Sequence, residues 1–292
     1  MIKNEGNMRL KKFEFSIKTF DYVGGGYKYK MAIPKIVHYC WFGGKEKPDD
    51  VKKCIKSWKQ HLSDYRFMEW NEKNFDINNL QYTKEAYHAK KYAFVSDVAR
   101  IEALYQYGGI YMDTDVELIK PIDSLLQYEA VSGFESEKRI PTGLMGCKKN
   151  QELFIELLNS YIGNHFKKID GDLDTTTNVT RITDTCLKYG LSLNNTKQTI
   201  KGFTLLPNDY LCPKNVETGE ITITENTLCI HHFDGSWLTV EARETAKLER
   251  VLKKMLPGKI AGYMAKGVAL IKVDGMGSFV KEGFKWVRKK RL

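Results

Sequence analysis

The sequence predicts an α/β fold with a largely parallel sheet, and three observations support this prediction. Strand-like and helix-like segments alternate between residues 33 and 118, in the order strand, helix, strand, helix, strand. The strand segments are short apolar runs, and the helix segments have apolar residues at helical spacing. Glycines close the first strand and the second helix. In such sheets ligands bind beyond the carboxyl ends of the strands.

Each element has its own signal in the chain. The first strand is IPKIVHYCWFGG (33–44), an apolar, β-branched run closed by glycines. KPDDVKKCIKSWKQHL (47–62) predicts a helix, because its apolar residues recur at helical spacing and Pro48 suits a helix start. YRFMEWNE (65–72) predicts the second strand. A second helix over 90–107 ends at Gly-Gly, and GIYMDTDVEL (109–118) predicts the third strand.

Composition places the chain among globular proteins with a substantial core. It has 292 residues, of which 42% are hydrophobic. No apolar run is long enough to span a bilayer, and the first residues lack the apolar region of a secretory signal. The six cysteines are scattered without metal-ligand spacing, which predicts reduced thiols in a cytosolic protein.

The positive charge is concentrated at the C-terminal end. Residues 247–292 hold 13 basic and 3 acidic residues, which equals the net charge of +10 of the whole chain. The preceding residues hold 33 of each sign and are neutral overall. We therefore predict three parts: an N-terminal extension (1–30), an α/β domain (31–240), and a basic amphipathic segment (241–292) with one or two short helices.

Two aspartates stand two residues apart in GGIYMDTD (108–115). On a strand, Tyr111, Asp113 and Asp115 would share one face. Two ionised carboxylates about 5 Å apart repel by roughly 3 kcal/mol at an effective dielectric of about 20. Water, a basic side chain, a shared proton or a divalent cation must offset this repulsion.

A second charged pair lies on the preceding predicted helix. Asp97 falls within its apolar arc, and Arg100 lies about 60° away on the adjacent ridge. An unpaired charge on the buried side is costly. The pair is either a structural i,i+3 ion pair or a charged pair at the mouth of a site.

SDVARIEALYQYGGIYMDTD (96–115) resembles the signature of the DXD-containing sugar transferases, in particular family 32 of the glycosyltransferases and the glucosylating clostridial toxins. The shared pattern is Ser-Asp, an Arg three residues after that Asp, and Gly-Gly-x-Tyr-x-Asp-x-Asp. IPKIVHYCWFGG and CIHHFDGSW (229–237) are similar to the opening and closing motifs of the family. The resemblance implies a GT-A fold, a single nucleotide-binding domain with a mixed, mostly parallel sheet.

The resemblance also implies a reaction. It is the retaining transfer of a sugar from a nucleotide diphosphate sugar, a UDP-hexose or UDP-N-acetylhexosamine, to a glycan acceptor in surface or capsule polysaccharide synthesis. The cofactor would be Mn²⁺ or Mg²⁺. Asp115 would bind the cation directly, and Asp113 the cation and the ribose. Asp97 would hold donor hydroxyls, and Arg100 the sugar or phosphate.

Four further residues would contact the donor by the same resemblance. Trp41 would stack on the nucleotide base, although an ordinary core tryptophan is the alternative. Tyr111 would contact the nucleotide or the sugar. Ser236 and Trp237 would close over the phosphates. The segments 134–146 and 175–180 are expected to line the sugar pocket.

The two adjacent histidines face opposite ways if they lie on a strand, so at most one points into the site. His232 stands three residues before Gly235, as the metal-binding His of another retaining GT-A family does. We therefore favour His232 over His231 as the third metal ligand.

The basic segment suggests where the protein acts. Basic residues with interleaved aromatics suit an anionic leaflet. Relatives build lipid-linked surface glycans, so we expect a peripheral protein at the cytoplasmic face of the membrane, with a glycan or lipid-linked acceptor. A solvated basic end is the alternative.

Two rival functions are weaker. DTDVE superficially matches the nucleophile motif of haloacid-dehalogenase-type phosphatases, but it follows about 80 residues of α/β structure. A basic nucleic-acid-binding protein lacks support, because no binding motif is present and the main domain is neutral.

Overall fold

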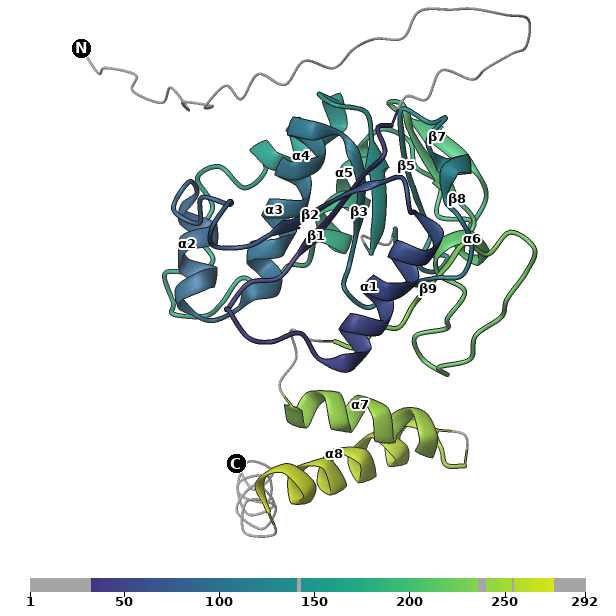
Figure 1. Cartoon of the computed structure of the whole chain (residues 1–292). Helices are drawn as coiled ribbons and strands as arrows, with labels where there is room; N and C mark the ends of the chain where they lie inside the picture. The colour runs from purple at the N-terminus through teal and green to yellow at the C-terminus, as the bar shows by residue number, and fades with distance from the viewer. Residues whose placement is uncertain (1–32, 141–142, 236–239, 254, 276–292) are drawn as a thin grey trace, which may run out of the picture. The chain divides into compact units, whose positions relative to one another are not determined.

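The computed structural model describes residues 33–140, 143–235, 240–253 and 255–275 (Figure 1). All of them belong to one unit of the chain, Met31–Leu292. The predicted N-terminal extension, residues 1–30, lies outside the described residues.

A seven-stranded sheet forms the centre of the main domain (Figure 1). Five of its strands run in one direction, and β6 and β7 run in the other. The expectation of a mixed, mostly parallel sheet is therefore confirmed. Its order is β2 (Arg66–Trp70), β1 (Ile36–Cys40), β3 (Gly109–Met112), β6 (Leu144–Cys147), β5 (Ala130–Gly133), β8 (Phe203–Leu206) and β7 (Gln198–Ile200).

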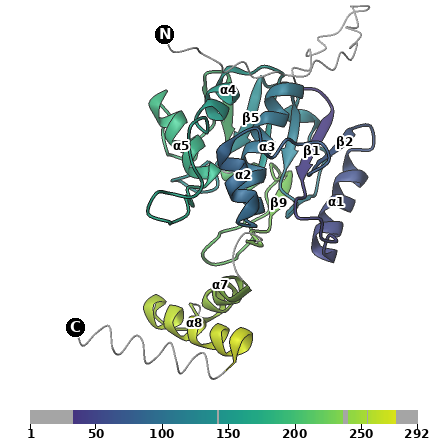
Figure 2. The same cartoon turned by 90° about the vertical axis from the view of Figure 1, so that its left-hand side faces the viewer.

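Helices cover both faces of this sheet. One core includes Leu104 of α3 (Tyr92–Tyr107) and Phe154 of α4 (Glu152–Asn159). The other includes Trp58 of α1 (Asp49–His61). Side chains of β3 alternate between the two cores, with Tyr111 in the first and Ile110 in the second. The remaining elements of the domain are α2 (Gln81–His88), which packs beside α3 (Figure 2), the 3₁₀ turn η1 (Asp123–Leu125), α5 (Asn178–Lys188) and α6 (Asn208–Leu211).

The Gly-Gly turn before β3 requires glycine. Gly109 has φ +111°, and a Cβ there would lie 2.6 Å from the Ile36 carbonyl oxygen. Beside this turn the buried His38 ring donates from Nε2 to the Gly108 carbonyl (2.8 Å) and accepts from Trp70 Nε1 (3.1 Å). Burial lowers the pKa of His38 to about 4, so the ring is neutral. These contacts fix where the chain enters the third strand.

The predicted third strand is interrupted at the aspartates. β3 ends at Met112, and residues 113–115 form a turn in which the Val116 amide donates to the Asp113 carbonyl (3.0 Å). The chain then enters β4 (Val116–Leu118), which pairs antiparallel with β9 (Cys229–His231) in a separate two-stranded sheet. The prediction that Asp113 and Asp115 share one face of a continuous strand is therefore wrong.

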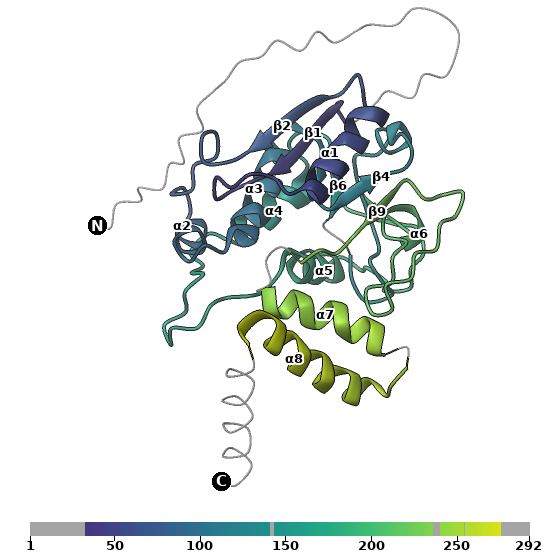
Figure 3. The same cartoon turned by 60° about the horizontal axis from the view of Figure 1, so that its bottom comes forward.

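Two helices, α7 (Val240–Leu252) and α8 (Gly258–Asp274), form a helical hairpin after the main domain (Figure 3). They match the expectation of one or two short helices, and residues 276–292 lie outside the described part. All six cysteines are buried and form no disulfide. Among the described helices, none combines the length and the apolar character that crossing a bilayer requires.

Candidate active site

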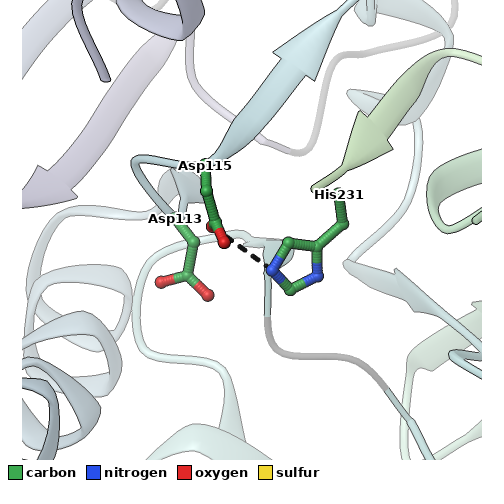
Figure 4. Close-up of side chains that lie close together, drawn as sticks. All are labelled: Asp113, Asp115 and His231. Atoms are coloured by element: carbon green, nitrogen blue, oxygen red, sulfur yellow. Dashed lines mark ion pairs between the residues drawn. The ribbon is translucent and has the colours of Figure 1, made fainter. Parts of the chain in front are cut away.

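Asp113, Asp115 and His231 converge at the carboxyl end of β3 (Figure 4). The two aspartates come from the β3–β4 turn, and His231 ends β9. One side-chain ligand atom from each residue lies within 4.8 Å of the others. His231 Nε2 lies 3.3 Å from Asp115 Oδ1. The β4–β9 pairing causes this approach, because His231 is the register partner of Val116, the residue after Asp115.

Asp115 is held as a carboxylate. Burial alone would raise its pKa, but the charge and hydrogen bond of His231 and the Asp234 amide, which donates to Oδ2 (3.0 Å), hold the pKa well below its usual range. For His231, burial would lower the pKa, and the Asp115 carboxylate instead raises it well above its ordinary value. The charge of Asp115 therefore favours the protonated form of His231.

The choice of His232 as third ligand is corrected by this geometry. The His232 ring faces Glu117, whose Oε2 lies 2.8 Å from Nε2, while its backbone amide donates to the Asp115 carbonyl (2.9 Å). Adjacent side chains on β9 and beyond it point to opposite sides, so His231 takes the inward position. The spacing of three residues between His232 and Gly235 therefore did not identify which histidine points toward the aspartates.

Arg100 joins the two predicted carboxylate positions into one network. Its Nη2 lies 3.1 Å from Asp113 Oδ1 and 3.2 Å from Asp97 Oδ1, and its Nη1 donates to Asp113 Oδ2 (3.3 Å). The Asp97–Arg100 pair is thus an i,i+3 ion pair and also lies beside the aspartate turn. Burial raises the pKa of Asp113, and the Arg100 charge opposes that rise.

Asp97 is buried against the start of α5. The Asn178 amide donates to Asp97 Oδ2 (3.4 Å), and the Asn178 side chain donates to the Asp97 carbonyl (2.8 Å). Burial raises the pKa of Asp97 to about 6, with Arg100 opposing and Asp113 adding to the rise. Asn178 belongs to the segment 175–180, which was expected near the sugar pocket.

Tyr111 lies beneath the aspartate turn. Its ring is buried, its hydroxyl donates to Asp113 Oδ1 (2.9 Å), and the Arg100 guanidinium lies 4.5 Å from the ring centroid. It was expected to touch the nucleotide or the sugar. In the structure its hydroxyl is used to orient Asp113.

Gly143 lies in the segment 134–146, which was expected to line the sugar pocket, but its own role was not predicted. Its carbonyl accepts from the Asp113 amide (2.7 Å), and a Cβ at this position would lie 2.7 Å from His231 Nδ1. The missing side chain therefore leaves room for the imidazole. Glu135, just after β5, also faces this region: burial raises its pKa, and the charges of His231 and Arg139 lower it.

Of the other residues predicted to contact the donor, the structure describes Trp41. Trp41 follows β1, is half-buried, and donates from Nε1 to the Lys45 carbonyl (2.6 Å). The Lys47 ammonium lies 5.7 Å from the centroid of the Trp41 ring. The ring is therefore at the surface of the domain near the strand ends. Ser236 and Trp237 lie outside the described residues.

The ligand atoms suit a hard divalent cation. Two carboxylates and one imidazole nitrogen form the type of mixed oxygen and nitrogen set that Mn²⁺ accepts. Asp97, Asp113 and Asp115 carry three negative charges when ionised, and Arg100 supplies one positive charge. With neutral His231 the balance is two negative charges, which one divalent cation would cancel.

Comparison with known proteins identifies this region. Residues 48–132 match the family model described as "Glycosyltransferase sugar-binding region containing DXD motif". This part of the chain is similar to the DXD-containing glycosyltransferases. The resemblance predicted from the signature at 96–115 is confirmed. Within the DXD-containing region lie Asp97, Arg100, Asp113 and Asp115, whereas Trp41 and His231 lie outside the matched residues.

Individual relatives of this DXD-containing region are distant. Inositol phosphoceramide mannosyltransferase 3 of Schizosaccharomyces pombe is 30% identical over 44% of this chain and 37% of its own length. An uncharacterised glycosyltransferase of Acanthamoeba polyphaga mimivirus is 28% identical over 63% of this chain and 74% of its own length. The chain thus spans little more than a third of the length of the first relative. Among solved structures, the PaToxG glycosyltransferase is 17% identical, with a TM-score of 0.44 over 53% of this chain and 68% of its own.

Proposed function

We propose that this protein is a glycosyltransferase that moves a sugar from a nucleotide diphosphate sugar to an acceptor hydroxyl. The observation that carries the proposal is the convergence of Asp113, Asp115 and His231 beside the Asp97–Arg100 pair. The four residues other than His231 lie within the stretch 48–132, which matches the model of a sugar-transferase family. We further propose that Mn²⁺ or Mg²⁺ binds between the two aspartates and His231.

The reaction breaks the bond between the anomeric carbon and the β-phosphate oxygen, and negative charge grows on the departing diphosphate. A bound divalent cation would supply stabilisation of that charge. Asp115 and His231 are the side chains that would hold the cation, and Asp113 is oriented by Arg100 and Tyr111. Fixed groups of this kind need no reorganisation during the reaction.

The donor sugar would lie against Asp97 and Arg100. Asp97 is anchored by Asn178, and Arg100 is fixed by two carboxylates, so both can position sugar hydroxyls. Trp41 would stack on the base of the nucleotide from beyond the end of β1. A retaining transfer on the front face needs no separate general base, because the departing phosphate can take the acceptor proton.

The relatives suggest the substrates. The S. pombe proteins are named mannosyltransferases of inositol phosphoceramide, a membrane lipid. We therefore infer a hexosyl donor, and an acceptor hydroxyl carried on a lipid or lipid-linked glycan, as in surface polysaccharide synthesis. The phosphatase alternative fits poorly. Both oxygens of Asp113 are already engaged, Oδ1 by Tyr111 and Arg100 and Oδ2 by Arg100, which disfavours Asp113 as a nucleophile.

A thermal-shift screen tests the proposal. The protein is heated with a panel of UDP- and GDP-sugars, each with and without Mn²⁺, because a bound ligand raises apparent stability by mass action. We expect a shift that needs both the cation and one nucleotide sugar, followed by slow release of the free sugar from that donor. Asp115→Asn should lose the shift while its circular dichroism is unchanged. No shift and no donor hydrolysis across the panel would overturn the proposal.

A further inference from the structure

Helix α8 exposes four large apolar residues and buries three alanines, although the larger Leu270 is also buried. Ile260, Tyr263, Met264 and Val268 are exposed by 50%, 72%, 48% and 46%. Ala261, Ala265 and Ala269 are fully buried. A helix packed on a soluble core shows the opposite arrangement, with its larger apolar side chains inward.

The exposed residues form one continuous face. At about 100° per residue, Ile260, Tyr263, Met264 and Val268 fall within an arc of about 140° on α8. We call these four residues the outer face. The three alanines fall on the adjoining arc of about 80°, which is the buried side of α8, where it packs on α7. A Cβ at Gly262, for example, would lie only 3.5 Å from the Glu249 carboxylate of α7.

The hairpin is already complete without the outer face. Its two helices pack through the alanine side, and Lys272 of α8 reaches Glu244 of α7 (2.6 Å). Two more large apolar residues are exposed in the hairpin, Val251 (60%) and Met255 (80%). Contiguous exposed apolar surface of this kind marks an interaction site.

The charge around the outer face selects the partner. Lys259 and Lys266 border one side of it, are both exposed, and make no ion pair within the described part of the chain. The stretch from Arg250 to Val273 contains six basic residues and no acidic residue. Apolar side chains flanked by lysines suit the boundary between the headgroups and acyl chains of an anionic leaflet.

We propose that the outer face of α8 docks on an anionic lipid surface, with its apolar residues in the interface and its flanking lysines on the headgroups. In the proposed attachment the outer face lies in the interface and does not cross the bilayer. The attachment would hold the enzyme beside a membrane-borne acceptor. It stands apart from the proposed chemistry, since vesicle binding requires neither donor nor cation.

Vesicle flotation of the full chain tests this inference. We expect the protein to float with phosphatidylcholine vesicles that contain phosphatidylglycerol, and not with phosphatidylcholine alone. Tyr263→Ser with Met264→Ser should lower the fraction bound at least tenfold. Lys259→Glu with Lys266→Glu should lower it similarly, and the wild-type protein should be released by about 0.5 M salt, where surface charges are screened.

Matched controls separate this surface from general stickiness and net charge. Ile162→Ser with Ile223→Ser removes two equally exposed apolar residues elsewhere, and Lys56→Glu with Lys73→Glu makes the same change in charge on the main domain. Both controls should float as the wild type does. Flotation unaffected by the α8 variants would overturn the inference. So would a dimer in sedimentation that Tyr263→Ser with Met264→Ser converts to a monomer while the wild type fails to float.

Discussion

The guanidinium of Arg100 contacts both carboxylate oxygens of Asp113, with Nη2 3.1 Å from Oδ1 and Nη1 3.3 Å from Oδ2. The same Nη2 lies 3.2 Å from Asp97. One buried arginine therefore orients a carboxylate of the candidate metal centre and a carboxylate of the candidate sugar site.

Replacing Arg100 by lysine keeps the charge but removes the two-pronged contact and the stacking on Tyr111. We expect Mn²⁺ affinity or donor turnover to fall by about 10- to 100-fold, as when other partners of metal ligands are removed. Isothermal titration and a donor-hydrolysis assay measure the two effects. Arg66→Lys, at an exposed position on β2, is the control. An Arg100→Lys variant with wild-type affinity and turnover would show that the two-point contact of the guanidinium with Asp113 is not needed.

Gly143→Ala tests whether the close approach of His231 matters. The added methyl would lie 2.7 Å from Nδ1, so the imidazole must shift from its position beside Asp115. We expect Mn²⁺ affinity to fall about tenfold with little loss of secondary structure. Gly258→Ala, where the added Cβ has its nearest neighbour at 3.9 Å, should leave affinity unchanged. Equal affinities in the two variants would argue against a role for His231.

Trp41→Ala should raise the donor KM and change kcat little, because base stacking acts away from the bond that breaks. Stacking worth about 1–3 kcal/mol corresponds to roughly 5- to 150-fold in affinity. Trp41→Phe keeps an aromatic face and should retain most of it. Steady-state kinetics with the identified donor measures both variants. An unchanged KM in Trp41→Ala would mean that the base binds elsewhere.

The buried His38 predicts a pH dependence of stability. Its native pKa is about 4, below the ordinary value, so the folded state favours the neutral ring. This stabilisation is fully present above about pH 6.5 and is lost as the pH drops, and the loss of unfolding free energy reaches about 3 kcal/mol below pH 4. Asp97 has the opposite effect. Its pKa is raised to about 6, so its contribution to the free energy of unfolding is lost as the pH rises from the ordinary pKa of an aspartate to about 6.

Urea unfolding isolates the His38 term when the wild type is compared with His38→Gln at about pH 7.5 and about pH 4.5. The variant is less stable at the higher pH, and the gap should narrow by roughly 2–3 kcal/mol at the lower pH. A gap that stays constant with pH would show that folding does not lower the pKa of His38.

Local patterns predicted the elements that position the site. α1 and α3 lie within two residues of the expected ranges, and Gly-Gly marked the entry to β3. The i,i+3 spacing also placed Arg100 beside Asp97, whereas its contact with Asp113 was not predicted. Spacing within one segment sufficed for these features, because each depends on neighbours along the chain.

The features that sequence did not predict depend on contacts between distant segments. The Asp113–Asp115 turn forms because the chain leaves the main sheet to pair β4 with β9, about 115 residues away. That pairing also turns His231 inward and His232 toward Glu117. Gly143 is needed only once His231 has arrived beside it. The sequence next to each of these residues contains no signal for the distant segment that the residue contacts.

The most direct test of the central claim is Mn²⁺ binding by isothermal titration to the wild type, Asp115→Asn, His231→Gln and His232→Gln, with donor hydrolysis measured on the same samples with and without EDTA. We expect that EDTA abolishes hydrolysis and that added Mn²⁺ restores it. We also expect that Asp115→Asn and His231→Gln bind the cation at least tenfold more weakly, while His232→Gln stays within about twofold of the wild type. Full hydrolysis in EDTA, or a greater loss in His232→Gln than in His231→Gln, would contradict the Asp113–Asp115–His231 centre.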